Sequence, residues 1–132
     1  MRAAIYCKSV VGKSAVAQER HLRRLCQQRG WTVDKVYVDP PSRPSGLANG
    51  KARLSLTTDL LCDDAKYGVV CVWRVGMLGL AIDDILWLLE EVSVKRRIEV
   101  VVPGDGFDTT VGDGMATKVI AALAAVGRTG SR

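Results

Sequence analysis

The sequence predicts a three-layer α/β domain, in which helices flank both faces of a largely parallel sheet. Apolar runs typical of strands alternate with segments of helical periodicity along almost the whole chain. Two of these runs, GVVCVW at 68–73 and IEVVVP at 98–103, are nearly continuous in apolar residues, as expected of strands buried on both faces. At 132 residues the chain is long enough for one domain around one hydrophobic core.

The first half of the chain contains two strands and a helix. A strand at 3–7 (AAIYC) leads into a helix from about residue 15 to 29, and Gly30 is a suitable residue to end it. A second strand follows at 31–39 (WTVDKVYVD). The next residues, 40–50, are rich in proline, serine and glycine and are expected to form a loop.

The second half continues the alternation of helices and strands. A helix is expected at about 54–65, before the strand at 68–73, and another at about 82–94, before the strand at 98–103. A Pro-Gly pair ends that last strand. A final helix is expected at about 115–126, so that four strands each precede a helix.

The composition is that of a globular, soluble protein. Hydrophobic residues make up 48% and charged residues 25%, and no apolar run approaches the roughly 18 residues that a membrane span needs. The amino terminus carries no apolar stretch of secretory length, so we expect a cytoplasmic protein without membrane contacts.

No metal site or cofactor is expected from the cysteines. Cys7, Cys26, Cys62 and Cys71 are widely spaced, and His21 is the single histidine. A zinc site would need more closely spaced ligands, so buried free thiols are the simpler interpretation.

The chain is basic, with a net charge of +5 and a pI near 9.2. This charge permits contacts with nucleic-acid phosphates but does not establish them. The basic residues form short groups, including those at 20–24 and 95–97. A solvated basic surface and a DNA-binding surface both remain open.

Chemistry in a parallel α/β sheet gathers at the carboxyl ends of the strands. The residues to examine are therefore those at 6–10, Asp39 with the loop after it, and those at 73–80 and 104–110.

The first of these segments partly fits a phosphate-binding loop. Gly12, Lys13 and Ser14 match the end of the pattern G-x-x-x-x-G-K-S/T, but Cys7 stands where the first glycine belongs. An acidic residue that ends a later apolar strand would be needed to anchor magnesium, but GVVCVW ends in Trp73 and Arg74 and IEVVVP ends in Pro103. Nucleotide hydrolysis therefore remains a weaker alternative.

Several pieces of the sequence, in order, resemble another kind of domain. They are AIYCKS, AQERHLRRLCQQRGW, VYVD, SG, GVVCVWRVGMLG, and GFDTT followed by VIAALAA. Together they resemble the catalytic domain of the serine recombinases, the resolvase and invertase family, from Met1 to about Val126. The resemblance implies an α/β domain that dimerises through a long carboxy-terminal helix. It also implies DNA cleavage by a serine hydroxyl that attacks phosphate and leaves a covalent phosphoserine link.

The opening pattern of that family is Tyr-x-Arg-Val-Ser, in which the last serine is the nucleophile. The corresponding residues here are Tyr6, Cys7, Lys8, Ser9 and Val10. Val10 therefore stands at the nucleophile position. Ser9 lies one place earlier, and successive strand residues point to opposite faces, so its hydroxyl is expected to face away from the site. Lys8 keeps a positive charge in place of arginine, but it cannot form a bidentate fork on phosphate.

A second family pattern, Trp-x-x-Asp-Arg-Leu-x-Arg, aligns with residues 73–80. Its aspartate and two arginines are replaced by Gly76, Met77 and Leu80. By analogy with other preorganised donors, each lost arginine removes about 3 kcal/mol of transition-state stabilisation. Two losses amount to a factor of roughly ten thousand in rate. Arg74 is a possible substitute cation.

Other positions that match the family survive. Tyr6, Gln18, Asp39 and Arg53 occupy places where the resemblance implies active-site or supporting residues, and residues 108–110 match the run before the long helix. Their structural interpretations are that Tyr6 packs in the core and that Asp39 ends a strand or caps a helix. The expected contacts with DNA, if there are any, come from Lys8, Arg53 and Arg74.

The sequence as a whole predicts a serine-recombinase-like domain over 1–126, a short flexible tail over 127–132 and no separate DNA-binding domain. We expect it to have lost strand cleavage and to act as a binding or regulatory module. It would pair with itself or with an active recombinase, or contact DNA through phosphates. The alternatives are residual cleavage through Ser9 and, less favoured, nucleotide binding.

Overall fold

A computed structural model of the chain describes residues 1–10, 12–41, 50–62, 64, 66–79, 81–112 and 120. Within them a five-stranded sheet has the order β2-β1-β3-β4-β5. Short 3-10 helices η1 (Val75–Leu78) and η3 (Pro103–Asp105) follow strands β3 and β4. The strands are β1 (Arg2–Lys8), β2 (Thr32–Asp39), β3 (Val69–Val72), β4 (Glu99–Val102) and β5 (Phe107–Asp108), and the α-helices are α1 (Ala15–Gln28), α2 (Lys51–Leu61) and α3 (Ile82–Leu89).

The sheet is largely parallel, as the sequence predicts. Strand β1 pairs in parallel with both β2 and β3, and β3 pairs in parallel with β4. The two-residue strand β5 pairs antiparallel with β4 and was not predicted. The four predicted strands are thus confirmed, with a short return strand at one edge.

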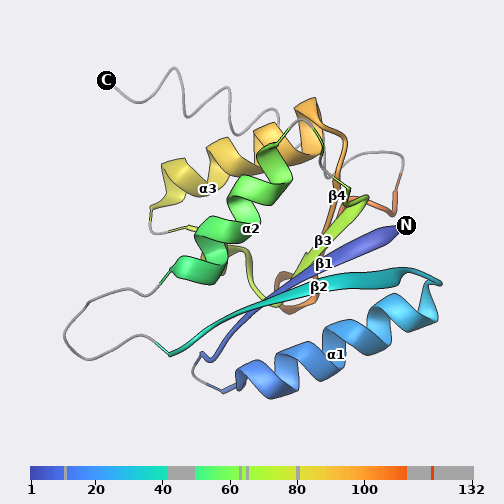
Figure 1. The fold of residues 1–132 in the computed structure, drawn as a ribbon, viewed down its shortest axis with the longest axis vertical. Helices are drawn as coiled ribbons and strands as arrows, with labels where there is room; N and C mark the ends of the chain where they lie inside the picture. Colours follow the sequence, from blue (N-terminus) through green and yellow to red (C-terminus); the bar gives the residue numbers. More distant parts are fainter. Residues whose placement is uncertain are drawn as a thin grey trace.

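Helices cover both faces of this sheet. Helix α1 lies on one face, whereas α2 and α3 lie on the other (Figure 1). The buried residues of β1 show the same division, because Ala3, Ile5 and Cys7 join an apolar cluster with α1, and Ala4 and Tyr6 join a cluster with α2 and α3. This alternation follows from the two-residue period of a strand. The predicted three-layer architecture is confirmed.

Helix α1 has local signals at both ends. The Ser14 hydroxyl caps its first turn by accepting a hydrogen bond from the Ala17 N–H at 3.1 Å. The helix ends just before Gly30, whose φ of +72° is the left-handed conformation typical of a helix terminus. The predicted boundaries of this helix are confirmed to within one residue.

Helix α2 begins earlier than predicted, at Lys51 rather than near Leu54, and it ends at Leu61 rather than Ala65. Its first N–H groups are capped by the side chain of Asp39, which lies at the end of β2. A cap supplied from a distant strand leaves no mark in the local sequence.

The predicted helix at 82–94 changes its winding near the middle. Helix α3 covers Ile82–Leu89 and passes into a π-helical segment, η2, over Glu90–Lys95. The Arg96 N–H donates to the carbonyl of Glu91, five residues earlier, as the wider π-turn requires. None of the helices in the described segments is long and apolar enough to cross a membrane. Apart from Ile120, the predicted helix at 115–126 lies outside the described residues, as does the tail at 127–132.

Candidate functional site

The predicted site residues gather where β1, β2 and β3 end. Lys8 is the last residue of β1 and pairs in register with Asp39, the last residue of β2. Gly76 and Met77 lie in η1, directly after β3. Leu80 and the Ser-Gly pair at 45–46 lie outside the described residues. The sheet thus brings the candidate residues together at its carboxyl edge, where ligands bind in folds of this type.

Asp39 is buried and bonded to three groups. Its carboxylate accepts the Tyr6 hydroxyl at 2.7 Å and the backbone N–H groups of Ala52 and Arg53 at 2.8 and 3.0 Å. The last two donors belong to the first turn of α2, where an anion is favoured by the helix dipole. Asp39 therefore caps α2 and joins it to β1 and β2.

Tyr6 stays protonated at neutral pH. Burial raises the pKa of its hydroxyl well above its usual range, and the hydrogen bond to Asp39 raises it further. The positive charge of Arg53 opposes this shift but does not outweigh it. The Tyr6 hydroxyl is consequently a fixed hydrogen-bond donor rather than an acid or base for catalysis.

Arg53 lies beside this cluster and is half-buried. Its guanidinium covers Gly50, because a methyl group at Gly50 would lie 2.8 Å from Arg53 Nη2. Arg53 also lines a groove of about 240 Å³ between α2 and α3, together with Thr57, Leu78 and Trp87. Of the three residues predicted to contact phosphate, Arg53 is the one whose backbone N–H donates to Asp39, the residue that also accepts the Tyr6 hydroxyl.

Gln18 is completely buried and holds the end of β1 to the following loop. Its amide oxygen accepts the Lys8 N–H at 3.2 Å, and its amide nitrogen donates to the carbonyls of Lys8 at 2.6 Å and Lys13 at 3.2 Å. These bonds use both ends of the amide. Gln18 is therefore a positioning residue for the loop that would carry the nucleophile.

The loop itself is closed by its own backbone. Val10 and Lys13 exchange two hydrogen bonds, of 3.0 and 3.1 Å, and Gly12 between them has a φ of +86°. The Ser9 hydroxyl accepts the Ala15 N–H at 2.9 Å, at the first residue of α1. Helix α1 covers the sheet face opposite to the one into which Tyr6 points. Val10, which the sequence pattern aligns with the nucleophile, has a hydrocarbon side chain.

The same loop gives no support to nucleotide binding in the residues described. Two N–H groups that would face a phosphate, those of Ala15 and Ala17, are bonded to Ser9 and Ser14. The Lys13 ammonium lies 3.6 Å from the centroid of the Trp73 ring, in a cation–π contact. These two N–H groups and the lysine are thus engaged within the chain.

The two described residues that align with the aspartate and first arginine of the second pattern, Gly76 and Met77, carry no charge. Gly76 is exposed, and Met77 packs against the apolar cluster of α2 and α3. Arg74 is exposed and paired, with Nη1 3.4 Å from a carboxylate oxygen of Asp105. That carboxylate also accepts the Val75 N–H at 2.7 Å. Of the three residues predicted to contact phosphate, Arg74 is therefore already partnered by a carboxylate.

His21 packs beside Trp73 on the α1 side of the loop. The two rings meet edge to face with centroids 5.0 Å apart. Burial lowers the pKa of His21 below its usual value of 6.5, and the positive charges of Lys13 and Arg24 lower it further. The two neighbouring cations thus add to burial in disfavouring the protonated imidazole.

We predict that protonation of His21 destabilises the fold. Because its pKa is lower in the folded than in the unfolded state, stability is complete above about pH 6.5 and declines as the pH falls towards the folded pKa. Urea denaturation from pH 7.5 to 5 measures this decline, and the His21→Gln variant should lose the part due to histidine. A single NMR titration with a pKa of 6.5 or higher would contradict the prediction.

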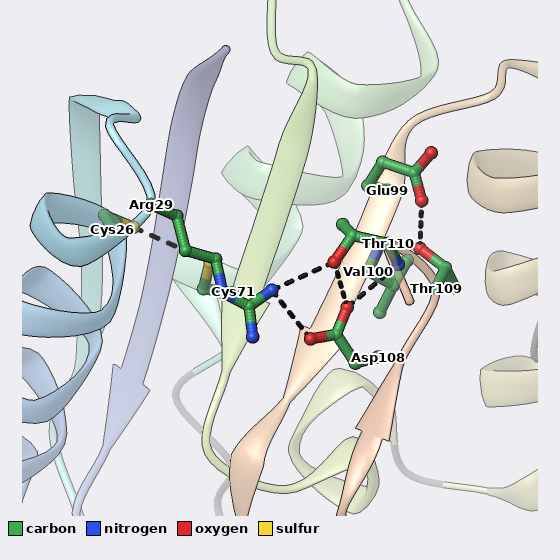
Figure 2. Close-up of polar contacts among 8 residues, drawn as sticks. All are labelled: Cys26, Arg29, Cys71, Glu99, Val100, Asp108, Thr109 and Thr110. Carbon is green, nitrogen blue, oxygen red and sulfur yellow. Dashed lines mark hydrogen bonds and ion pairs between the residues drawn. The ribbon is translucent and has the colours of Figure 1, made fainter. Parts of the chain in front are cut away.

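Sequence reasoning missed a network that connects α1 to β5. Figure 2 shows Arg29, at the end of α1, reaching Asp108 and Thr110, with Nη1 2.7 Å from Asp108 Oδ2 and 2.9 Å from Thr110 Oγ1. Thr109 bonds the Glu99 carboxylate and accepts the Val100 N–H at 2.8 Å. The sequence marked 108–110 as a motif, but nothing in it indicates Arg29 as the partner.

Asp108 remains ionised because of this network. Burial alone would raise the pKa of its carboxyl, but hydrogen bonds from Thr110 and the Arg29 guanidinium outweigh burial and lower it. Its carboxylate accepts hydrogen bonds of 2.8 Å from the Thr110 N–H and 2.5 Å from the Thr110 hydroxyl, as aspartate does in a turn. The network anchors the chain just before residue 113.

All four cysteines are free thiols, as predicted, and three of them are buried. Cys7, Cys26 and Cys71 are buried, and the sulfur atoms of Cys26 and Cys71 lie 3.8 Å apart. Burial raises the pKa of Cys7 to about 12. Cys62 is exposed, at the end of α2, so the prediction of burial is wrong for this residue.

Comparisons with known proteins agree with this fold. The family model of the resolvase N-terminal domain matches residues 6–131. Among solved structures, the N-terminal catalytic domain of TP901-1 integrase is 22% identical, with a TM-score of 0.77 over 99% of this chain and 97% of that one. A resolvase family site-specific recombinase from Streptococcus pneumoniae is 16% identical, with a TM-score of 0.75 over 100% of this chain and 91% of that one.

A third solved structure has the same fold at lower similarity. The catalytic domain of ISC1926 TnpA, an IS607-like serine recombinase, is 20% identical and has a TM-score of 0.62, over 98% of this chain and 83% of that one. No curated protein sequence gives a significant match.

Proposed function

The chain belongs to the resolvase family of serine recombinases, and from this premise we propose that it binds DNA through the family's catalytic-domain fold without cutting it. Domains of this family act on DNA and often dimerise. The domain would still bind DNA, as the family does, but would no longer cleave it. The carboxyl edge of the sheet would keep the arrangement of the site without its reaction.

One observation carries the proposal: Val10 stands where the family has its nucleophilic serine. A valine side chain has no atom that can attack phosphorus. Ser9, the nearest hydroxyl in sequence, accepts a hydrogen bond from the N–H of Ala15, the first residue of α1. To act as a nucleophile, Ser9 would have to leave that bond and cross to the sheet face of Tyr6.

The surroundings of the loop support the same conclusion. The family's paired arginines would stabilise charge developing on the scissile phosphate, and the positions aligned with its aspartate and first arginine hold Gly76 and Met77. The loss of one such donor costs about 3 kcal/mol, or roughly a hundredfold in rate. By contrast, Gln18 and Asp39 form hydrogen bonds to the backbone, and these bonds hold the fold together.

The test is formation of a covalent protein–DNA adduct. We expect none with a labelled pool of random-sequence duplexes, even at high protein concentration, on a denaturing gel. An active serine recombinase with its own target is the positive control, and the proposed defects correspond to a rate at least about ten thousand times lower. Ser9→Ala is the matched variant: an adduct in the wild type that disappears in this variant would replace the proposal with residual cleavage through Ser9.

We further propose that the domain pairs with another copy of itself or with an active recombinase. Three large apolar side chains on α2 and α3 support an association surface: Leu54, Ile82 and Trp87 are 61%, 66% and 52% exposed. Light scattering over a range of concentrations measures self-association, and mixing with an active recombinase measures the second kind of pairing. A monomer at all concentrations that leaves the active enzyme unchanged would exclude both.

A further inference from the structure

The net charge of the chain is concentrated in one segment. Residues 8–29 contain six of the 19 basic residues and one of the 14 acidic residues. The rest of the chain has 13 of each kind and is therefore neutral, so the whole net charge of +5 belongs to this segment. The basic residues are Lys8, Lys13, Arg20, Arg23, Arg24 and Arg29, and the acidic residue is Glu19.

In the fold this segment becomes the layer on one side of the sheet. It comprises the end of β1, the loop and α1, and α1 covers the face opposite to α2 and α3 (Figure 1). The buried side of α1 carries Gln18, Leu22 and Cys26. Arg20, Arg23 and Arg24 are exposed on this helix, so much of the charge concentrated in the sequence also lies together in space.

The bonding of these residues shows which charges are available. Arg23 pairs with Glu19 at 2.7 Å, and Arg29 pairs with Asp108. Within the part of the chain that the structure describes, Arg20 and Arg24 have no hydrogen bond or ion pair, and both are exposed. They lie four residues apart and therefore project from the same side of the helix.

Lys13 and His21 extend this group towards the loop. His21 is three residues before Arg24, and the Lys13 ammonium and the His21 ring both contact Trp73. The pKa of His21 is lowered first by burial and then by the positive charges of Lys13 and Arg24, so both cations lie close enough to act on the imidazole. We name Lys13, Arg20, His21 and Arg24 the α1 face.

We propose that the α1 face binds the phosphates of nucleic acid, as a contact surface separate from the carboxyl edge of the sheet. This inference deepens the proposed function and rests on it. Two unpaired arginines on one side of a helix provide fixed donors for phosphate oxygens. The 14 residues of α1 span about 21 Å, a length comparable to six base pairs of duplex.

The apolar residues favour nucleic acid over an anionic membrane as the partner. A helix that lies in a membrane surface needs an apolar side opposite its charges, free to enter the lipid. The apolar side of α1 is buried against the sheet, and Val16 is the one large hydrophobic side chain of α1 that is exposed. Phosphates presented by a nucleic-acid backbone require no insertion and fit the α1 face better.

The test compares two double variants with the same change in net charge. Arg20→Gln with Arg24→Gln alters the α1 face, and Lys51→Gln with Lys66→Gln removes two exposed lysines elsewhere. Affinity for a fluorescent DNA duplex is measured from 50 to about 200 mM salt. We expect the α1 variant to bind roughly tenfold more weakly and its salt slope to fall by about 1.8, because about 0.9 is lost per phosphate contact. The control pair should retain the wild-type slope.

Other outcomes have distinct meanings. Equal weakening of both variants would show that net charge alone matters and would overturn the inference, as would weakening confined to a Lys8→Gln and Arg74→Gln variant at the sheet edge. Binding to phosphatidylserine vesicles but not to the duplex would overturn it in favour of a lipid surface. If the wild type does not bind duplex even at 50 mM salt, the proposed function fails together with the inference. Circular dichroism confirms that each variant is folded.

Discussion

Replacing Asp39 with alanine is expected to lower the free energy of unfolding by about 3 kcal/mol. The change removes the acceptor for three donors, the Tyr6 hydroxyl and the backbone N–H groups of Ala52 and Arg53. These donors are buried or partly buried, and α2 loses its cap at the same time. Urea denaturation followed by tryptophan fluorescence measures the loss.

A smaller change separates the parts of this effect. The variant Tyr6→Phe removes one hydroxyl from the cluster and leaves the cap of α2 in place, so we expect a loss of about 1 kcal/mol. If the Asp39→Ala protein were as stable as the wild type but no longer bound DNA, Asp39 would be a functional residue rather than a structural one. That outcome would also weaken the proposal of a disused active site.

Replacing Gln18 with leucine should have the second largest effect, a loss of about 2 to 3 kcal/mol. Leucine fills much of the same volume but leaves the Lys8 N–H and the carbonyls of Lys8 and Lys13 without their partner. Gln28→Leu, an exposed position on the same helix, is the matched control and should change stability little. Urea denaturation of both variants provides the comparison.

The variant Gln18→Glu tests the same hydrogen bonds by placing a carboxylate at this position. Its carboxylate would face the two carbonyl oxygens that the amide nitrogen of Gln18 now contacts. Repulsion and burial would raise the pKa of the new carboxyl, so the variant should recover stability as the pH falls. Loss of the same size at pH 5 and pH 8 would show that the amide hydrogen bonds do not hold this loop.

The strands and most helices could be predicted because their signals are local. The run GVVCVW contains β3 completely, since a strand buried on both faces needs continuous apolar residues. Helix α1 carries its own cap, Ser14, and its own terminator, Gly30. The family was identified from short motifs whose order and spacing survive in the chain.

The features that were missed depend on partners far away in sequence. Helix α2 begins at Lys51 because Asp39 caps it, and an apolar pattern alone places the start near Leu54. Strand β5 consists of Phe107 and Asp108, too short to show any period, and it exists through pairing with β4. The π-helical end of α3 likewise has no local signature.

The site shows the same limit. Alignment with the family located Tyr6, Gln18 and Asp39. It did not show that Tyr6 in β1 bonds Asp39 in β2, or that Gln18 in α1 bonds the end of β1. Charge counting found basic groups without revealing that Arg20 and Arg24 remain unpaired while Arg23 and Arg29 are neutralised. Bonding partners decide which of these residues are available, and they are known once the fold is known.

The distribution of sulfur gives the molecule a chemical difference between its two sides. Among the described residues, Cys7, Cys26 and Cys71 all belong to the apolar cluster under α1, whereas the cluster under α2 and α3 contains no cysteine. A thiol reagent reaches those three sulfurs when α1 separates from the sheet, and the rate then reflects the opening equilibrium of that layer alone. Once the exposed Cys62 has reacted, these three buried cysteines thus report how firmly the basic helix is held.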